Sequence, residues 1–381
     1  MRRNVKQLGL EFNIPYLFEF VKLALLVDQP YWTGIGVYAV ELYKLLAPHI
    51  EDLKLIYAGA IADDNQFYER KPYLKRTNVW SLRPYVIYYN YKAIMRDSSL
   101  DSYLFHYTGT EYYPLKWRNG VITIHDLIKD GLFPSAKLGL RKLMETIDMR
   151  RKHSESQRLA RRALNIVTIS EKAREDLRTR TGLESTAIHH WVIKERFKER
   201  DKMQSIKKLN LNPDFNYFLA VSTDRGSKRI DLLKRFSDSL PSKYRMIKIG
   251  APIDSHNTIN VGKVDSSVYP HYFNASMAYV HLSDDEGFGW PIVEALGSKI
   301  FVICRPTAIN KELLGDAAFY IQEGYTSTKI QSFIRNMESE ESKEEMRKKM
   351  MERMKSFSPE MAAEKYMDVY RRLESKISRV E

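Results

Sequence analysis

Short apolar runs separated by polar, helix-compatible stretches repeat along most of this 381-residue chain. The first run covers residues 23–27 and the last covers 319–322. This alternation is typical of an α/β protein with parallel sheets. The other predicted strands or extended segments are 54–60, 86–89, 103–106, 121–124, 165–169, 187–191, 217–221, 246–250, 259–262, 278–282 and 300–304.

The alternation is interrupted once, by the charged and polar stretch ERFKERDKMQSIKKLNLN at residues 195–212. We interpret this stretch as an interdomain linker. It separates an N-terminal domain, 1–194, from a C-terminal domain, 213–357. Residues 1–19 precede the first strand and form an arm without assigned chemistry, and 359–375 predict a final helix.

The richest stretch for chemistry is 278–304, which predicts a strand, a glycine-containing loop, a helix and a second strand. Gly287 and Gly289 leave the backbone open to a ligand, and the following helix start favours an anion. Glu286 and Glu294 flank this place, and ionised carboxylates accept hydrogen bonds from sugar hydroxyls. The implied ligand is a phosphorylated sugar or a nucleotide. The alternative is that the glycines only form a turn and Glu294 only complements the helix terminus.

Three other loops carry candidate residues at strand ends, where open α/β sheets bind ligands. Gly34 and Gly36 lie between the first strand and a helix that the pattern begins near residue 37. His125 follows strand 121–124, although His125 could equally be hydrogen-bonded into its own loop. Lys228 and Arg229 precede a helix and could neutralise a diphosphate, or could belong to a solvated basic turn.

Composition limits the protein class without choosing a function. Hydrophobic residues make up 44% and charged residues 29%, as in globular proteins, and the single cysteine, Cys304, excludes an internal disulfide. The sequence shows no signal-peptide core and no apolar run of membrane-spanning length. The formal net charge is +13, and residues 136–200 hold 17 Lys and Arg against 9 Asp and Glu. An anionic membrane surface, nucleic acid and a merely solvated face remain open as explanations.

The segment from Glu286 to Glu294, EGFGWPIVE, resembles the E-x7-E motif of the retaining GT-B glycosyltransferases of family 4. Further landmarks of that family follow one another in the family's order. They are Gly34-Ile35-Gly36 with Tyr38, His125-Asp126, the segment IVTIS at 166–170, and Lys228 at its spacing from Val221. The resemblance implies a GT-B α/β fold, with two Rossmann-like domains whose parallel sheets face a central cleft. It also implies that the last segment, 358–381, returns to the N-terminal domain.

The resemblance also implies roles for individual residues. Glu286 orients the donor sugar, Glu294 holds the ribose, and the backbone between them, Gly287, Phe288 and Gly289, approaches sugar and phosphate. His125 lines the sugar pocket, and Lys228 stabilises the departing diphosphate, while the loop of Gly34 and Gly36 faces the phosphates. Thr223 stands at one usual arginine position, so Arg225 or Arg229 is expected to substitute.

The expected reaction is the transfer of a hexose from a UDP- or GDP-linked donor to a glycan or glycolipid hydroxyl, with retention. No cofactor and no metal are expected, because basic side chains and helix termini carry the charge. We expect a cytoplasmic protein, with an anionic membrane surface as a hypothetical partner. A nucleotide-sugar epimerase on the same fold is one alternative. A nucleic-acid-directed protein is another, although the chain has no recognised nucleic-acid motif.

Overall fold

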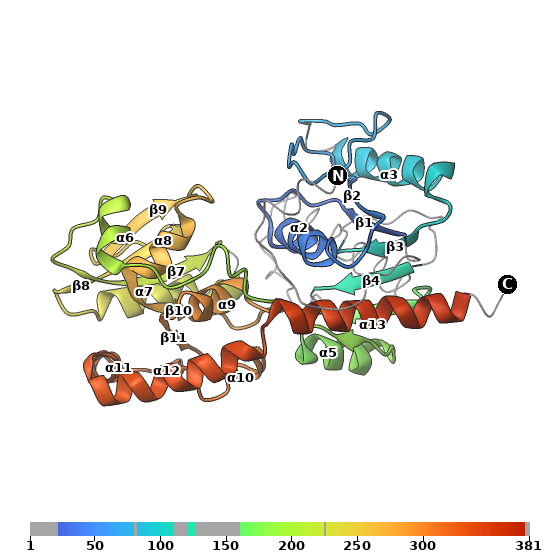
Figure 1. Cartoon of the computed structure of the whole chain (residues 1–381). Helices are drawn as coiled ribbons and strands as arrows, with labels where there is room; N and C mark the ends of the chain where they lie inside the picture. The colour runs from blue at the N-terminus through green and yellow to red at the C-terminus, as the bar shows by residue number, and fades with distance from the viewer. Residues whose placement is uncertain (1–21, 80–81, 110–119, 126–160, 225, 378–381) are drawn as a thin grey trace, which may run out of the picture. The chain divides into compact units, whose positions relative to one another are not determined.

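The computed structural model describes residues 22–79, 82–109, 120–125, 161–224 and 226–377. The contacts divide the chain into two compact units. Unit 1 comprises residues 1–188 and 363–381, and unit 2 comprises 189–362. Each unit contains one parallel sheet with helices packed on it (Figure 1).

The sheet of unit 1 has the strand order β2-β1-β3-β4-β5-β6, with every neighbouring pair parallel. All five residues of β1 are buried, because a strand covered on both faces needs apolar side chains on both. The strands are β1 Leu23–Val27, β2 Leu53–Tyr57, β3 Leu104–Tyr107, β4 Gly120–Ile124, β5 Asn165–Thr168 and β6 Thr186–Ala187. The helices are α2 Gly34–Leu46, α3 Arg83–Ile94, η3 Ser98–Leu100 and α5 Glu171–Thr181.

The sheet of unit 2 has the order β12-β11-β10-β7-β8-β9 and is also parallel. Its order changes direction between β10 and β7, and such switch points are where open α/β sheets bind ligands. The strands are β7 Asn216–Ser222, β8 Tyr244–Gly250, β9 Thr258–Gly262, β10 Ser276–His281, β11 Phe301–Cys304 and β12 Phe319–Tyr320. The helices are α6 Lys202–Lys208, η4 Gly226–Lys228, α7 Ile230–Asp238, α8 Tyr269–Ala275, α9 Trp290–Gly297, α10 Ala308–Leu314, α11 Ser327–Glu338 and α12 Glu340–Lys355.

Two of the predicted strands are corrected by the structure. Residues 86–89 lie inside helix α3, and of the predicted segment 187–191 only Ala187 belongs to a strand, β6. The β-branched and aromatic residues of 86–89 favour a strand locally, but the buried positions follow a helical period. Those buried positions are Ile87, Asn90, Tyr91 and Ile94.

The predicted linker, 195–212, also has a different structure from the one expected. It contains helix α6, whose start is capped by the Asp201 side chain accepting from the Gln204 amide at 2.6 Å. Ile206 is buried, and α6 packs against α8 within unit 2. The charged residues that suggested a linker are the solvent side of an amphipathic helix.

The last helix, α13 (Pro359–Ile377), begins in unit 2 and ends in unit 1. Within unit 1 it is joined to the sheet by buried hydrogen bonds. His106 Nδ1 lies 2.7 Å from the Tyr370 hydroxyl, and its Nε2 lies 2.7 Å from the Thr123 hydroxyl. The Tyr38 hydroxyl bonds both the Thr123 hydroxyl, at 2.9 Å, and the Tyr366 hydroxyl, at 2.7 Å. These neutral groups satisfy one another, as buried polar groups must.

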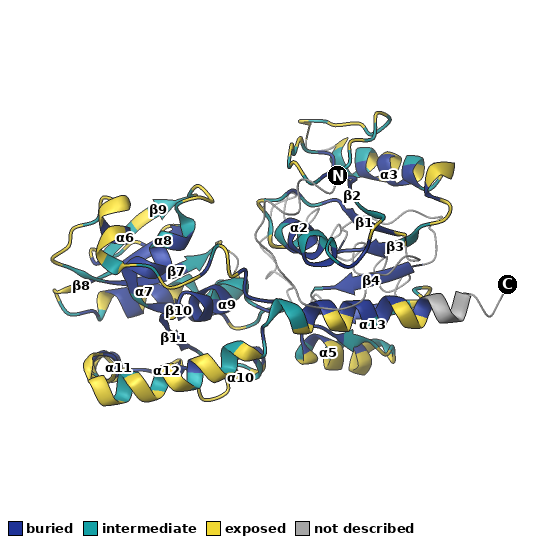
Figure 2. Ribbon diagram, viewed as in Figure 1, coloured by how far each residue is buried: buried dark blue, intermediate teal, exposed yellow. Residues whose placement is uncertain are grey.

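Helix α3 buries one face against the sheet of unit 1 and exposes the other (Figure 2). Its buried residues join a core cluster that includes Phe105, Tyr107 and Ile122. None of the described helices is long and apolar enough to cross a bilayer.

Candidate active site

The glycine loop after β10 starts helix α9 through an unusual backbone conformation. Gly289 is the N-cap residue and has φ of 100°, a region that side chains other than glycine rarely adopt. The helix begins at Trp290, with Pro291 in its first turn. Glu294 is therefore in the second turn, one turn later than the sequence suggested.

The structure brings Lys228 and Glu286 together from two different loops. The amine of Lys228 donates to Oε1 of Glu286, and both side chains are mostly buried. The two loops are also joined by their backbones, because the Asp284 amide donates to the Ser227 carbonyl at 2.8 Å. Lys228, predicted to contact the diphosphate, and Glu286, predicted to contact the sugar, thus lie side by side.

His281 completes this group of charges from the end of β10. Its Nε2 lies 3.7 Å from Oε1 of Glu286, and its Nδ1 is hydrogen-bonded to the Tyr279 hydroxyl at 3.0 Å. Burial lowers the pKa of His281 to about 4, with Glu286 opposing and Lys228 reinforcing that shift. His281 is therefore neutral at pH 7 and adds a polar group without adding a charge.

Glu294 is buried and is held by one hydroxyl. The Tyr269 hydroxyl donates to its Oε2 at 2.9 Å. Burial raises the pKa of Glu294 to about 7, and the Tyr269 hydrogen bond and the nearby charge of Arg196 only partly oppose this. A buried carboxylate that titrates near neutral pH in the helix after a strand-end loop is a functional-site feature.

Arg229 is already engaged by carboxylates. Its guanidinium pairs with Asp231 at 2.8 Å, with Asp284 at 3.1 Å and with Glu323 at 2.6 Å. Arg305 pairs with the same Asp284 and Glu323. A phosphate would have to compete with these carboxylates for Arg229. The other candidate, Arg225, lies outside the described residues.

Phe288 supports the loop from behind. Its side chain is buried and packs against His190 and Phe357, with ring centroids 4.6 and 6.1 Å away. His190 in turn stacks on Trp290 at 4.4 Å. Any contact of Phe288 with a donor would therefore come from its backbone, as the sequence analysis expected.

The glycine loop of unit 1 has a different construction. Helix α2 begins at Gly34, three residues earlier than predicted, and Thr33 caps it by accepting from the Gly36 amide at 3.1 Å. A Cβ on Gly36 would lie 2.1 Å from the Pro30 carbonyl oxygen. Gly36 is therefore required by close backbone packing, whereas Gly34 is exposed at the helix start.

His125 follows β4, as predicted, and its ring is fixed. Its Nε2 donates to the Thr108 carbonyl at 2.8 Å, which makes Nδ1 the accepting nitrogen of the neutral ring. Burial lowers the pKa of His125 to about 4. Gly109 makes room for the ring, because a Cβ there would lie 2.5 Å from it. Asp126 and residues 136–160 of the basic segment lie outside the described residues.

Three residues of this region were missed by the sequence analysis: His281, Tyr269 and Arg305. His281 and Arg305 each lie at or directly after the carboxyl end of a strand, and that position could have indicated them. Tyr269 carries no such signal, because only the tertiary structure places it against Glu294. Among the described residues, no group of three His, Cys, Asp or Glu side chains has an arrangement suited to a metal.

Comparison with known protein families gives a match for residues 201–357, to the family described as "Glycosyl transferases group 1". This region contains Lys228, Glu286 and Glu294. The resemblance of unit 2 to a glycosyltransferase family is thereby confirmed, and the retaining, family 4 assignment stays a prediction.

Two curated relatives are mannosyltransferases by name. The "O-antigen chain mannosyltransferase B" of Escherichia coli is 24% identical over 387 residues, covering 90% of this chain and 96% of the relative. The "O-antigen chain mannosyltransferase RfbU" of Salmonella typhimurium is 25% identical over 238 residues, covering 58% of this chain. The match spans 61% of the length of that second relative.

A solved structure shows the same fold across nearly the whole chain. The sucrose-phosphate synthase from Thermosynechococcus elongatus superposes with a TM-score of 0.68 at 17% identity, covering 93% of this chain and 99% of its own. The predicted architecture, two Rossmann-like domains with parallel sheets, is confirmed.

Proposed function

We propose that this chain, which has the GT-B fold and whose residues 201–357 match the glycosyl transferases group 1 family, is a glycosyltransferase that moves a hexose from a UDP- or GDP-linked donor to a glycan or glycolipid hydroxyl. The names of the two curated relatives favour mannose as that hexose and an O-antigen type of glycan as the acceptor.

The observation that carries the proposal is the Lys228–Glu286 pair between the loops after β7 and β10. The departure of a nucleoside diphosphate develops negative charge, which a positioned ammonium group stabilises. A carboxylate beside it can accept hydrogen bonds from the hydroxyls of the sugar that is transferred. Lys228 and Glu286 thus supply the two interactions that a nucleotide-sugar donor needs at its reacting bond.

Other residues have supporting roles in this proposal. Glu294 accepts hydrogen bonds from the ribose hydroxyls, and the backbone from Gly287 to Gly289 lies along sugar and phosphate. The loop of Gly34 and Gly36 faces the phosphates, and His125 is the sugar-contacting side chain of unit 1. Arg229 reaches the phosphates only by leaving some of its carboxylate partners.

Retention of configuration and metal independence are parts of the same proposal. Both are supported by the resemblance of EGFGWPIVE to the family 4 motif, and metal independence also by the cationic Lys228. Proton NMR of the new glycosidic bond checks retention, and turnover in the presence of EDTA checks metal independence. We further propose a cytoplasmic location with an acceptor held at the membrane surface.

Isothermal titration calorimetry with UDP, GDP and their hexose conjugates tests the donor assignment. We expect one nucleotide to bind to the wild type and to bind at least tenfold more weakly to Glu294→Ala, since a ribose hydrogen bond to a charged group is lost. Glu340→Ala is the matched control, because Glu340 is highly exposed on α12 and should leave the affinity unchanged. Absence of binding by every nucleotide in the panel would refute the donor assignment.

A further inference from the structure

Helix α3 presents an exposed aromatic face to solvent. Tyr85 is 74% exposed, Tyr88 38% and Tyr89 42%, and Val79 and Leu82 just before the helix are also exposed. Half of the large apolar and aromatic side chains exposed on the described residues lie in this one segment. The three tyrosines share one side of the helix, opposite the buried Ile87 and Tyr91, because Tyr88 and Tyr89 follow Tyr85 by three and four residues.

The same face is cationic and lacks acidic residues. Residues 70–96 contain seven Lys and Arg and no Asp or Glu. Lys92 and Arg96 continue the exposed side of α3 from Tyr85 and Tyr88. Lys75 is tied to the helix, since its amide donates to Asn90 at 2.8 Å and its amine lies 4.7 Å from the centre of the Tyr89 ring.

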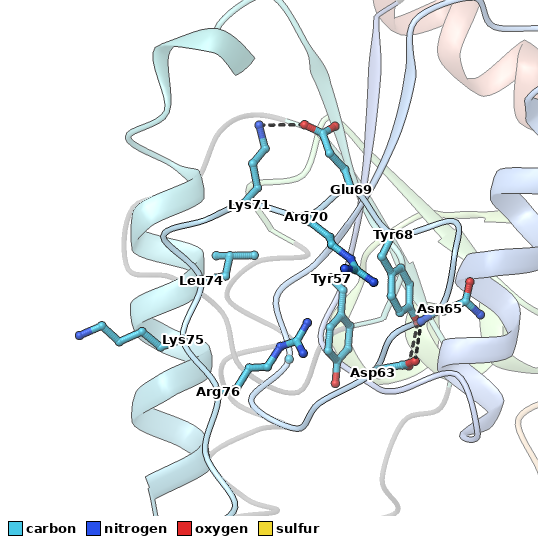
Figure 3. Close-up of a pocket in the computed structure, with 11 residues that line it drawn as sticks. Tyr57, Asp63, Asn65, Tyr68, Glu69, Arg70, Lys71, Leu74, Lys75 and Arg76 are labelled. Carbon is cyan, nitrogen blue, oxygen red and sulfur yellow. Dashed lines mark hydrogen bonds and ion pairs between the residues drawn. The ribbon is translucent and has the colours of Figure 1, made fainter. Parts of the chain in front are cut away.

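Six of the seven cations of this segment, all except Arg83, fall into two groups. Arg70, Lys71 and Arg76 line a pocket beside β2 (Figure 3). There Arg70 and Arg76 pair with Asp64, at 3.9 and 3.3 Å, and Lys71 pairs with Glu69 at 3.0 Å.

The second group is not neutralised in this way. Lys75, Lys92 and Arg96 are exposed, and within the described part of the chain no carboxylate lies at ion-pair distance from any of them. The amine of Lys75 extends toward α3, away from the guanidinium groups of Arg70 and Arg76 (Figure 3). Positive charge that no neighbouring carboxylate neutralises is therefore concentrated at α3, beside the exposed tyrosines.

We propose that this α3 face, comprising Tyr85, Tyr88, Tyr89, Lys75, Lys92 and Arg96, docks the protein on an anionic lipid bilayer. Tyrosine rings suit the headgroup level, because they have an apolar body and a polar tip. Unpaired cations around them are attracted by the negative surface potential of anionic lipids. Neither feature alone selects a bilayer, but together on one helix they match an interfacial, membrane-surface helix.

The described remainder of the basic segment, 161–200, fits a bilayer less well. It holds ten Lys and Arg against six Asp and Glu. On α5 the cations alternate with carboxylates, with Arg174 paired to Glu171 at 3.0 Å and Arg178 to Glu175 at 3.1 Å. The positive charges on the α5 surface are therefore compensated by neighbouring carboxylates, although α5, like the segment around α3, contains several arginines.

Vesicle flotation on the full chain tests the docking surface. Vesicles of phosphatidylglycerol mixed with phosphatidylcholine are compared with vesicles of phosphatidylcholine alone, at low and at high salt. We expect the wild type to float only with the anionic vesicles and to lose binding as salt rises. Tyr85→Ser/Tyr88→Ser/Tyr89→Ser should lose flotation. Lys75→Gln/Lys92→Gln/Arg96→Gln should bind about a hundredfold more weakly, at roughly tenfold or somewhat less for each charge.

The matched control is Arg174→Gln/Arg178→Gln/Arg180→Gln, which removes the same charge from α5 and should float like the wild type. Circular dichroism melting checks that each variant is folded. Wild-type protein that does not float, α3 variants that float as well as the wild type, or a control that fails equally would each overturn the proposal. So would binding of a labelled DNA duplex in preference to the anionic vesicles.

Docking through the α3 face rests on the proposed function only for its purpose, since an acceptor held at a membrane would need the enzyme at that membrane. Flotation is measured without donor or acceptor, so its failure says nothing about sugar transfer. Conversely, a protein that binds no nucleotide but floats through α3 would refute the donor assignment and keep the docking surface.

Discussion

The two sheets of this protein have the same parallel construction, but the chemistry at their strand ends differs. In unit 2 the loops after β7, β10 and β11 carry ion pairs, among them Lys228–Glu286 and the pairs of Arg229 and Arg305. In unit 1 two polar groups at β3 and β4 are neutral: His106, which lies within β3 and is hydrogen-bonded, and His125, which directly follows β4. Burial keeps both histidines neutral at pH 7.

Under the proposed function, this difference fits a division of tasks between the units. A diphosphate is best stabilised by fixed positive charge, so unit 2 suits the donor phosphates. Neutral donors and acceptors suit hydroxyl groups, whose hydrogen bonds need direction but no charge. The difference is also testable, because charged and neutral sites respond differently to substitution and to pH.

The largest effect should come from removing the cation of unit 2. Lys228→Ala should lower kcat by about 10²–10³-fold, the typical cost of deleting one group that stabilises developing charge in a transition state. Steady-state kinetics at saturating donor give the value. Lys234→Ala is the control, because Lys234 lies in the nearby helix α7 but pairs with Asp238 on the surface. A loss below tenfold would remove Lys228 from the leaving-group role.

The effect of pH on the free energy of unfolding should differ between Glu294 in unit 2 and His106 in unit 1. Glu294 has a folded pKa of about 7 against an ordinary 4.5, so its neutral form is favoured by folding. Its stabilising contribution is complete below about pH 4.5 and is lost as the pH rises through 7. Relative to the wild type, Glu294→Gln should therefore gain roughly 3 kcal/mol between about pH 5 and pH 8, at about 1.4 kcal/mol per pKa unit.

Urea unfolding of wild type and Glu294→Gln at several pH values measures this gain. Glu338→Gln serves as the control, since Glu338 lies on α11 outside the site and only accepts from the Tyr244 hydroxyl. A difference between wild type and Glu294→Gln that stays constant across this range would show that Glu294 titrates normally.

In unit 1 the pH effect should have the opposite direction. His106 is buried neutral, and burial lowers its pKa to about 3. His106→Phe should cost about 2 kcal/mol above pH 7, because the hydroxyls of Thr123 and Tyr370 lose their partner. The cost should shrink as the pH falls below the ordinary histidine pKa of 6.5, since only the unfolded histidine gains a proton there.

Unfolding by urea at neutral and mildly acidic pH gives both values for His106. His256→Phe is the matched control, because His256 is exposed and the change should stay within about 0.5 kcal/mol. If the His106→Phe cost grew toward acid pH, the assignment of His106 as neutral and hydrogen-bonded would be wrong.

The smallest effect should come from the glycine that starts α9. Gly289→Ala should cost about 1–2 kcal/mol of folding stability, because alanine is strained at φ of 100°. Gly324→Ala is the control, with open space around its Cβ and no positive φ. Thermal melting of both variants measures this loss of stability. Equal melting temperatures would show that the loop adapts to a side chain.

The sequence was sufficient for the fold class and for the site of unit 2. Nearly all strands were predicted to within a few residues, because strands buried on both faces must be continuous apolar runs. Lys228 and Glu286 were found because they lie in loops that directly follow strands, and Glu294 because it lies in the helix that follows such a loop. Those loops converge on one sheet edge in any parallel α/β arrangement.

Tertiary structure decided what local sequence left ambiguous. Residues 86–89 have strand-forming side chains, yet they belong to α3, because the helical spacing of Ile87, Tyr91 and Ile94 buries an apolar stripe against the sheet. Residues 202–208 of the predicted linker form α6 for the same reason. Ile206 is buried there, and α6 packs against α8 only once the chain is folded. Burial of periodic apolar positions outweighs local propensity.

Electrostatic roles were also decided by the fold. The sequence contains cations in 136–200 and in 70–96, but it could not show which of them have carboxylates beside them. It could not show that Arg229 is shared among three acids, or that Tyr269 lies on Glu294. Composition and spacing therefore determine which chemical groups are available along the chain. Burial and pairing determine which of them carry charge and where it acts, because both depend on neighbours that are distant in sequence.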